Sequence, residues 1–359
     1  MKNIFYTIVL FFVSLNAVAQ LYIKPNNSQL TYQGRVSSNA DSTSIYWSGS
    51  TVSINFKGTI LKAKLKSTKE DAYFYVIIDD SVTTKIEVLK NQPAQYYTLA
   101  SGLGLINHSA TLFKVSNCTS ANQFYGFQIN DEGKVLKARK LPKRKIEFYG
   151  NSITVGHGAD RPASLADSGE PKYFNNYYTY AAITARYFNS QYVNTSRSGI
   201  GVTISWFPEI MPETYNRLDP LDSNSEWDFR KYQPDVIVVN LFQNDSWLIN
   251  NPSHPQFENR FGTQKPSEAF IINAYKNLIS NIRKNNLSSV IICALGNMDA
   301  TKEGSKWPGY IREATNQLND DKIFNVVFPY KNTEGHPRRI EQTAMAKQLI
   351  SFIEANVKW

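Results

Sequence analysis

Residues 144–160 read RKIEFYGNSITVGHGAD, and this stretch decides how the second half of the chain folds. A short, continuously apolar strand over 145–149 runs into a glycine-led turn and then into a helix. Such strands, alternating with helices, are typical of a parallel sheet that is covered on both faces. Gly150 permits a backbone conformation that larger residues resist, so the turn can lift Ser152 clear of the sheet edge. The alternative is that Ser152 only caps the following helix.

The same alternation continues to the end of the chain. Strands are predicted at 191–196, 235–242, 289–295 and 323–328, and helices at 173–189, 266–286 and about 337–357. The predicted fold class of residues 141–359 is therefore α/β, with a parallel sheet between two layers of helices.

Residues 20–140 follow a different pattern, in which apolar and polar residues alternate in short runs between Gly, Asn, Asp and Ser. Runs such as DAYFYVIIDD (71–80) are rich in aromatic and β-branched residues. This pattern predicts an antiparallel β-sandwich of the jelly-roll type. Two domains also agree with the chain length, because one hydrophobic core seldom organises more than about 300 residues.

The first 19 residues have the features of a secretory signal peptide: a basic Lys2, an apolar run through about Val13, and small residues at Ala17 and Ala19. We therefore expect an exported protein, periplasmic or extracellular, with no stable membrane insertion. The two cysteines, Cys118 and Cys293, fall in different domains, which argues against a disulfide framework.

The formal charge of +9 would suit an acidic partner such as an anionic polysaccharide. The Lys and Arg residues are scattered, however, with one cluster in KARKLPKRK (137–145). We interpret that cluster as a solvated linker and expect no nucleic-acid partner, since an exported protein rarely meets nucleic acid. The sequence does not indicate an oligomeric state.

Polar side chains follow four of the predicted strands, and parallel strands end at one edge of a sheet, where ligands bind. A serine hydroxyl needs a neighbouring base to act as a nucleophile. Ser152 is the predicted nucleophile and His336 the predicted base, with Pro337 beginning the last helix. Glu334 can orient the His336 ring as the acid of a triad does, or a backbone carbonyl can take that place.

The other three histidines are weaker candidates for the base. His157 lies close enough to Ser152 in sequence to line the same cleft and is a candidate substrate-binding residue, but it is poorly placed to reach back to the hydroxyl. His254 belongs to a long loop that can cover the cleft. His108 falls in the sandwich domain, where we expect an ordinary turn residue.

Attack on an acyl carbon places negative charge on its oxygen, which requires positioned donors. The predicted donors are the backbone N–H of Ser152, the N–H of Gly199 and the side-chain amide of Asn244. Asp245 is expected to brace its loop. Trp206, Trp247 and Trp307 are candidates for stacking on sugar rings, with packing in the core as the alternative for each.

GNSIT (150–154), Gly199, Asn244 and His336 occur in the order of the four blocks of the SGNH, or GDSL-type, hydrolases, which this chain therefore resembles. The preceding sandwich and EGHP (334–337) are similar to carbohydrate esterase family two. The resemblance implies a polysaccharide deacetylase with an acetylated carbohydrate as substrate and with no metal and no cofactor. It also implies Ser152 as nucleophile, His336 as base, and Gly199 and Asn244 as oxyanion donors.

The chain departs from the family pattern at two places. Asn151 stands where the family has Asp, and Phe242-Gln243 replaces the usual Gly-Thr before Asn244 and Asp245. These changes bear on substrate fit more than on reaction type. Two other functions stay open at this point: an esterase or acyltransferase acting on lipid or aryl esters, and a protein that binds carbohydrate without catalysis.

Overall fold

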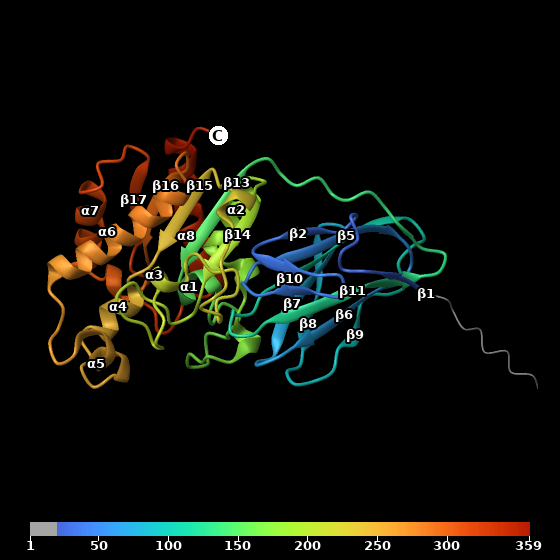
Figure 1. Ribbon diagram of the computed structural model, residues 1–359, viewed down its shortest axis with the longest axis horizontal. Helices are drawn as coiled ribbons and strands as arrows, with labels where there is room; N and C mark the ends of the chain where they lie inside the picture. Colours follow the sequence, from blue (N-terminus) through green and yellow to red (C-terminus); the bar gives the residue numbers. More distant parts are fainter. Residues whose placement is uncertain (1–19) are drawn as a thin grey trace, which may run out of the picture.

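The computed structural model describes residues 20–359, so the predicted signal peptide lies outside the described residues. An all-β domain and an α/β domain lie side by side along the long axis of the molecule (Figure 1). The predicted fold class is confirmed: an antiparallel β-sandwich precedes a parallel-sheet domain. None of the helices in the described residues is both long and apolar enough to cross a membrane.

The sandwich consists of two six-stranded antiparallel sheets. In β6 every second residue is buried, and its buried side chains meet those of the facing sheet in one core. The first sheet contains β1 (Gln20–Ile23), β3 (Val36–Ser38), β4 (Thr43–Ile45), β6 (Leu61–Ser67), β9 (Gln95–Ala100) and β11 (Asn122–Asn130). The second contains β2 (Thr31–Gln33), β5 (Thr51–Lys57), β7 (Ala72–Ile78), β8 (Ser81–Val88), β10 (Asn107–Lys114) and β12 (Lys134–Val135).

The α/β domain is built on a five-stranded parallel sheet with the order β14-β13-β15-β16-β17. Its strands are β13 (Lys145–Gly150), β14 (Gln191–Ser196), β15 (Val236–Asn240), β16 (Val290–Leu295) and β17 (Ile323–Val327). Gly150 at the end of β13 pairs in register with Ser196 and with Asn240. The loops that follow these three strands therefore start at the same level of the sheet edge.

Helices cover both faces of this sheet (Figure 1). The helices are α1 (Ser152–Val155), α2 (Tyr180–Tyr187), α3 (Met211–Thr214), α4 (Gln243–Leu248), α5 (Pro255–Phe261), α6 (Glu268–Asn285), α7 (Trp307–Asn316) and α8 (Arg339–Asn356). On one face α2 and α8 pack over Phe148 and Ile292, and on the other α6 and α7 pack over Ile237 and Cys293.

Two helix predictions need correction. The helix predicted over 173–189 is divided into two 3₁₀ turns and a shorter α2, because Asn175 and Asn176 make side-chain contacts that a continuous helix would not allow. The last helix begins at Arg339, so Pro337 lies two residues before it and not at its first position.

The two domains are fixed to one another by a buried ion pair. Arg35 of the sandwich and Glu147 of β13 are almost inaccessible to solvent, and their side chains lie 2.8 Å apart. The Arg35 guanidinium also donates to the hydroxyl of Tyr149 at 3.0 Å. Phe113 and Val115 of the sandwich pack in the same cluster as the core of the α/β domain. The position of the sandwich relative to the sheet is thus set by packing as well as by the linker.

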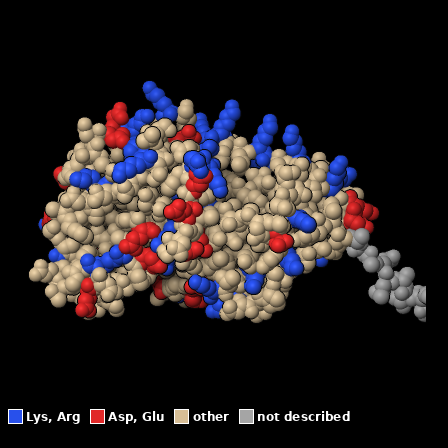
Figure 2. All heavy atoms as spheres, viewed as in Figure 1, with Lys and Arg blue, Asp and Glu red and all other residues tan. Residues whose placement is uncertain are grey.

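Lys and Arg side chains are dispersed over the visible surface and form no single basic patch there (Figure 2). Residues 137–144 of the basic linker belong to no helix or strand. Both cysteines are buried and unpaired.

Candidate active site

The turn after β13 presents Ser152 at the edge of the sheet. A Cβ atom on Gly150 would lie 2.1 Å from Oγ1 of Thr154, so the backbone can enter α1 at this angle only with glycine there. The side chain of Asn151 caps α1, because its Oδ1 accepts the N–H of Ile153 at 3.1 Å. This task needs only an oxygen, which explains how Asn can replace the usual Asp. Ser152 is the first residue of α1, so its hydroxyl is not the cap.

The hydroxyl of Ser152 contacts His336. The distance from Oγ of Ser152 to Nε2 of His336 is 2.8 Å, and the other ring nitrogen, Nδ1, lies 2.5 Å from Oδ2 of Asp167. The backbone N–H of His336 donates to the same carboxylate oxygen at 2.9 Å. Gly335 has φ +67, and a Cβ atom there would approach the Asp167 side chain to 3.0 Å. These residues therefore form a hydrogen-bonded Ser–His–Asp chain with a base next to the hydroxyl.

The residue at Nδ1 differs from both sequence-based alternatives. Glu334 makes no side-chain hydrogen bond to His336 in the described residues and lies on the rim of a neighbouring cavity, and no backbone carbonyl occupies the place. The group at Nδ1 is the carboxylate of Asp167, which lies in the irregular segment between α1 and α2. Sequence reasoning missed it because 169 residues separate it from His336 and no motif surrounds it. The only signal in the sequence was a group of acidic residues, Asp160, Asp167 and Glu170, in the long loop after the predicted nucleophile, and nothing in it singled out Asp167.

Asp167 is held in its charged form. Burial alone would raise the pKa of this carboxyl group, but the hydrogen bond and the charge of His336 outweigh burial and place the pKa well below its usual value. Arg338 lies on the other carboxylate oxygen, with Nη1 3.4 Å from Oδ1. A carboxylate that stays ionised can fix the tautomer of His336 and stabilise the imidazolium that forms when the ring takes a proton.

His157 packs face to face on His336. The two ring centroids lie 3.9 Å apart with an interplanar angle of 11°, and Nδ1 of His157 lies 3.0 Å from Oγ of Ser198. Burial, reinforced by the neighbouring His336, lowers the pKa of His157 to about 3. His157 is therefore neutral at physiological pH and supports the ring of His336 from one side. As expected from its position, it does not reach the hydroxyl of Ser152.

Ligand atoms of His157, Asp167 and His336 all lie within 4.8 Å of one another, a spacing that a metal ion could span. Both nitrogens of His336, however, already take part in hydrogen bonds to Ser152 and Asp167. A metal could use His336 only by breaking that chain, so the geometry suits proton transfer better than metal ligation.

The predicted oxyanion donors lie in loops that begin at the same edge of the sheet as the turn carrying Ser152, because Gly150 pairs in register with Ser196 and Asn240. In residues 20–359 no group accepts the N–H of Ser152 or of Gly199, so both remain available to a ligand. Gly199 has φ +87, a left-handed conformation that favours glycine, and its missing side chain lets Trp206 and Phe207 pack at this point. The side-chain amide of Asn244 lies beside this loop, because Nδ2 donates to the carbonyl of Ile200 at 2.7 Å.

Neighbouring side chains fix the orientation of Asn244. The indole N–H of Trp206 donates to Oδ1 of Asn244 at 3.0 Å, which directs the amide nitrogen the other way. Asp245 is fully buried and accepts the N–H groups of Val202 and Thr203 at 3.0 and 2.6 Å. Asp245 thus braces the loop that carries Gly199, as the sequence suggested.

Phe242 takes the conformation for which the family uses glycine. Its φ is +80, which is unfavourable for a residue with a side chain. Packing compensates, because the ring is buried against Tyr275 at 4.8 Å and Trp307 at 5.0 Å between centroids. Packing thus stabilises Phe242 in this left-handed conformation at the start of α4, which carries Asn244.

A cavity of about 460 Å³ adjoins His336 and Asp167 and extends over Trp247 and residues 330–335. The indole N–H of Trp247 donates to Asp299 at 2.8 Å. Trp206, half exposed, lies on the oxyanion side, with the ring of His254 edge-on to it at 5.2 Å. Of the three predicted tryptophans, Trp247 thus lines the cavity beside His336 and Trp206 contacts Asn244, and a sugar contact stays a prediction for both.

Trp307 is placed differently from the other two. It packs on Phe242 and Tyr310 and supports the Asn244 loop from behind, so its place fits the packing alternative for that residue.

The α/β domain has the fold of a GDSL-type hydrolase, and comparisons of sequence agree. A model of the GDSL-like lipase/acylhydrolase family matches residues 146–346, and a model of the carbohydrate esterase 2 N-terminal domain matches residues 32–138. The chain belongs to the GDSL-like lipase/acylhydrolase family, with the domain pair of the family two carbohydrate esterases.

Individual relatives give the same result. The cellulase/esterase CelE of Acetivibrio thermocellus is 33% identical over 93% of this chain, which spans 40% of that relative's length. An acetylxylan esterase/glucomannan deacetylase of Cellvibrio japonicus is 24% identical, over 94% of this chain and 91% of its own. A solved family two carbohydrate esterase from Clostridium thermocellum, in complex with cellohexaose, is 32% identical with a TM-score of 0.79, and the match covers 91% of this chain and 98% of that one.

Proposed function

We propose that this protein is an exported serine esterase that removes acetyl groups from O-acetylated carbohydrate. The observation that carries the proposal is the 2.8 Å contact between Oγ of Ser152 and Nε2 of His336, in a chain of this family. The names of relatives, acetylxylan esterase and glucomannan deacetylase, support an acetylated glycan as the substrate. The predicted signal peptide supports export.

The reaction would proceed through an acyl-enzyme. Oγ of Ser152 attacks the acetyl carbon while Nε2 of His336 takes the hydroxyl proton, and Asp167 stabilises the imidazolium. The N–H groups of Ser152 and Gly199 and the amide of Asn244 would bind the developing oxyanion. His336 then returns the proton to the sugar oxygen, which leaves as an alcohol.

Water completes the cycle. His336 takes a proton from a water molecule, whose oxygen attacks the acetyl carbon of acetyl-Ser152. As the second tetrahedral intermediate collapses, the bond between that carbon and Oγ breaks, His336 returns the proton to Oγ, and the acetyl group leaves as acetic acid, which ionises to acetate. No metal or cofactor is needed in this sequence of steps.

We propose that Trp206 and Trp247 form the walls against which a sugar ring packs. They lie on the oxyanion side and the His336 side of the site, respectively, and sugar rings present apolar C–H faces to aromatic side chains. His157 would act by positioning His336 rather than by touching substrate.

The proposal is tested by acetate release from a panel that contains 4-nitrophenyl acetate, acetylated xylan, acetylated glucomannan and an ester of a long-chain fatty acid. Release that is fastest on an acetylated glycan supports it. Faster turnover of the lipid ester, or glycan binding without any release, would replace it with one of the other two functions.

A further inference from the structure

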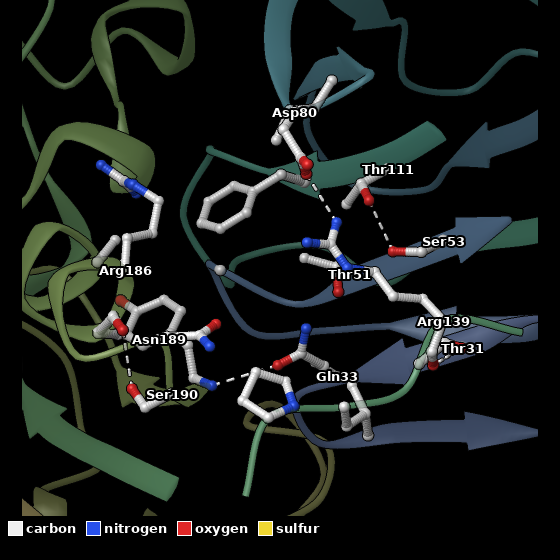
Figure 3. Close-up of a pocket in the computed structure, with 18 of the residues that line it drawn as sticks. Thr31, Gln33, Thr51, Ser53, Asp80, Thr111, Arg139, Arg186, Asn189 and Ser190 are labelled. Atoms are coloured by element: carbon white, nitrogen blue, oxygen red, sulfur yellow. Dashed lines mark hydrogen bonds and ion pairs between the residues drawn. The ribbon is translucent and has the colours of Figure 1, made fainter. Parts of the chain in front are cut away.

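A second groove, with a volume of about 340 Å³, lies at the junction of the two domains (Figure 3). The α/β domain contributes the end of α2, the loop residues Asn189 and Ser190, and Tyr192 at the start of β14. The candidate active site follows the other end of β14, roughly 16 Å away for a strand of this length. The groove is therefore separate from the site of Ser152. Most of its remaining lining comes from β2, β5 and β10 of the sandwich and from linker residues 139–142, with Asp80 and Tyr177 among the others.

The sandwich wall of the groove offers hydrogen-bonding groups with spare capacity. Thr51 lines this wall, but its Oγ1 is covered by protein and has no partner in the described residues, so the accessible groups are its neighbours. Beside it the hydroxyl groups of Ser53 and Thr111 lie 2.7 Å apart and leave further acceptor positions free. The amide oxygen of Gln33 accepts the N–H of Tyr192 at 3.3 Å, which leaves its NH₂ group able to donate. Such a set of hydroxyl and amide groups suits the hydroxyls of a sugar.

The floor of the groove is aromatic. Phe113 and Tyr192 lie nearly parallel, with centroids 6.4 Å apart and an interplanar angle of 5°, and Tyr177 meets Phe113 edge-on at 5.2 Å. Phe113 and Tyr192 are mostly buried, so they shape the floor rather than project from it. A mixed surface of this kind can take the apolar face of one sugar ring while its rim binds the polar edge.

The charge of the groove is not balanced. Arg139 is neutralised by Asp80, whose carboxylate lies 2.7 Å from its guanidinium. Arg186, on the opposite wall in Figure 3, stacks 3.8 Å from the ring centroid of Tyr177 and has no ion pair and no side-chain hydrogen bond within residues 20–359. Stacking fixes the orientation of the guanidinium, and its N–H groups remain free to donate hydrogen bonds. A planar guanidinium of this kind matches a carboxylate, which it binds with two parallel hydrogen bonds.

We propose that this groove binds an oligosaccharide that bears uronic acid residues, with a sugar carboxylate on Arg186 and sugar hydroxyls on Ser53, Thr111 and Gln33. The site would hold acidic stretches of a polysaccharide while Ser152 acts elsewhere on the chain. It rests on the proposed function only in expecting a glycan as the ligand, and binding here requires no ester and no nucleophile.

The test is isothermal titration calorimetry of the full-length Ser152→Ala protein with hexagalacturonate at low salt, and with cellohexaose as the neutral comparison. Arg186→Ala in this background is expected to weaken hexagalacturonate binding about tenfold or more, because a charge-assisted pair is lost, and to leave cellohexaose binding unchanged. Arg186→Lys, which keeps the charge but not the fork of donors, should fall between the two. Arg312→Ala, on the exposed side of α7, is the matched control and should bind like its parent.

Absence of hexagalacturonate binding, or equal affinity in the Arg186→Ala and Arg312→Ala variants, would overturn the proposal. So would an equal loss of cellohexaose binding, because the carboxylate would then play no part. In the otherwise wild-type enzyme Arg186→Ala should hydrolyse 4-nitrophenyl acetate normally. A protein that binds hexagalacturonate through Arg186 but releases no acetate would contradict only the esterase function.

Discussion

Oδ2 of Asp167 lies 2.5 Å from Nδ1 of His336, across 169 residues of sequence, and accepts the backbone N–H of His336 as well. One carboxylate oxygen thus fixes both the ring and the backbone of the proposed base. The nearer acid in sequence, Glu334, is exposed and makes no side-chain hydrogen bond to His336 in the described residues.

Asp167→Asn is expected to reduce kcat by about a hundredfold or more, because an amide can hold His336 in the wrong tautomer and cannot stabilise the imidazolium. Glu334→Gln is the matched control and should retain nearly full activity. Steady-state kinetics on 4-nitrophenyl acetate measures both. A large loss in Glu334→Gln with nearly full activity in Asp167→Asn would instead assign the role of the acid to Glu334.

The hydrogen bond from Trp206 to Asn244 predicts that variants at these two positions lower kcat to different extents. Asn244→Ala removes a donor and should lower kcat by about a hundred- to a thousandfold with little change in KM. Trp206→Phe keeps an aromatic wall but loses the N–H that orients the Asn244 amide, so kcat should fall by a smaller factor. If Trp206→Phe instead raised only KM, the indole would be a sugar contact without a positioning role.

The left-handed conformation of Phe242 predicts an unusual order of stability among variants at this position. Phe242→Ala should lower the free energy of unfolding by about 3–5 kcal/mol, because a buried aromatic ring is lost. Phe242→Gly should lower the free energy of unfolding by about 1 kcal/mol less than Phe242→Ala does, because glycine adopts φ +80 without strain. At ordinary positions glycine is the more destabilising of the two residues. Urea denaturation of the three proteins measures the order, and a Gly variant less stable than the Ala variant would show that the strain is absent.

The environment of His157 predicts a pH dependence of stability. Its pKa in the folded protein is about 3, compared with an ordinary 6.5, so the unfolded chain takes up this proton at higher pH than the folded one. The stability contributed by neutral His157 is complete above about pH 6.5 and is lost as the pH falls toward 3. The expected slope from this one group is at most about 1.4 kcal/mol per pH unit.

His157→Phe keeps a ring against His336 but cannot titrate. Its free energy of unfolding, measured by urea denaturation between pH 6.5 and 4, should therefore fall less steeply than that of the wild-type protein. Parallel curves for the two proteins would show that His157 does not carry this effect.

The fold class could be predicted from the sequence because the two domains differ in the spacing of their apolar residues. Alternation in runs such as β6, and continuous apolar strands such as β15, each indicate one kind of sheet. Because parallel strands end at one edge of a sheet, the sequence also predicted that the four polar loops lie together at that edge. The domain boundary near residue 140 stays a prediction, between the last sandwich strand at Val135 and β13 at Lys145.

Tertiary contacts that leave no local pattern could not be predicted. Asp167 lies in an irregular segment, and only the folded chain brings it to His336. The side-chain contacts that divide the helix predicted over 173–189 are likewise made with residues distant in sequence, such as Tyr75. Trp307 resembled a substrate residue because it follows a strand, but Phe242 needs it as a packing partner.

The most direct test of the account is acetate release from an acetylated glycan by the wild-type protein, by Ser152→Ala, and by Ser223→Ala as a matched control on an exposed loop. The account predicts that the wild type and Ser223→Ala release acetate at the same rate and that Ser152→Ala releases none above background. If Ser152→Ala released acetate nearly as fast as the wild type, the assignment of the nucleophile would be contradicted, and with it the reaction proposed for this site.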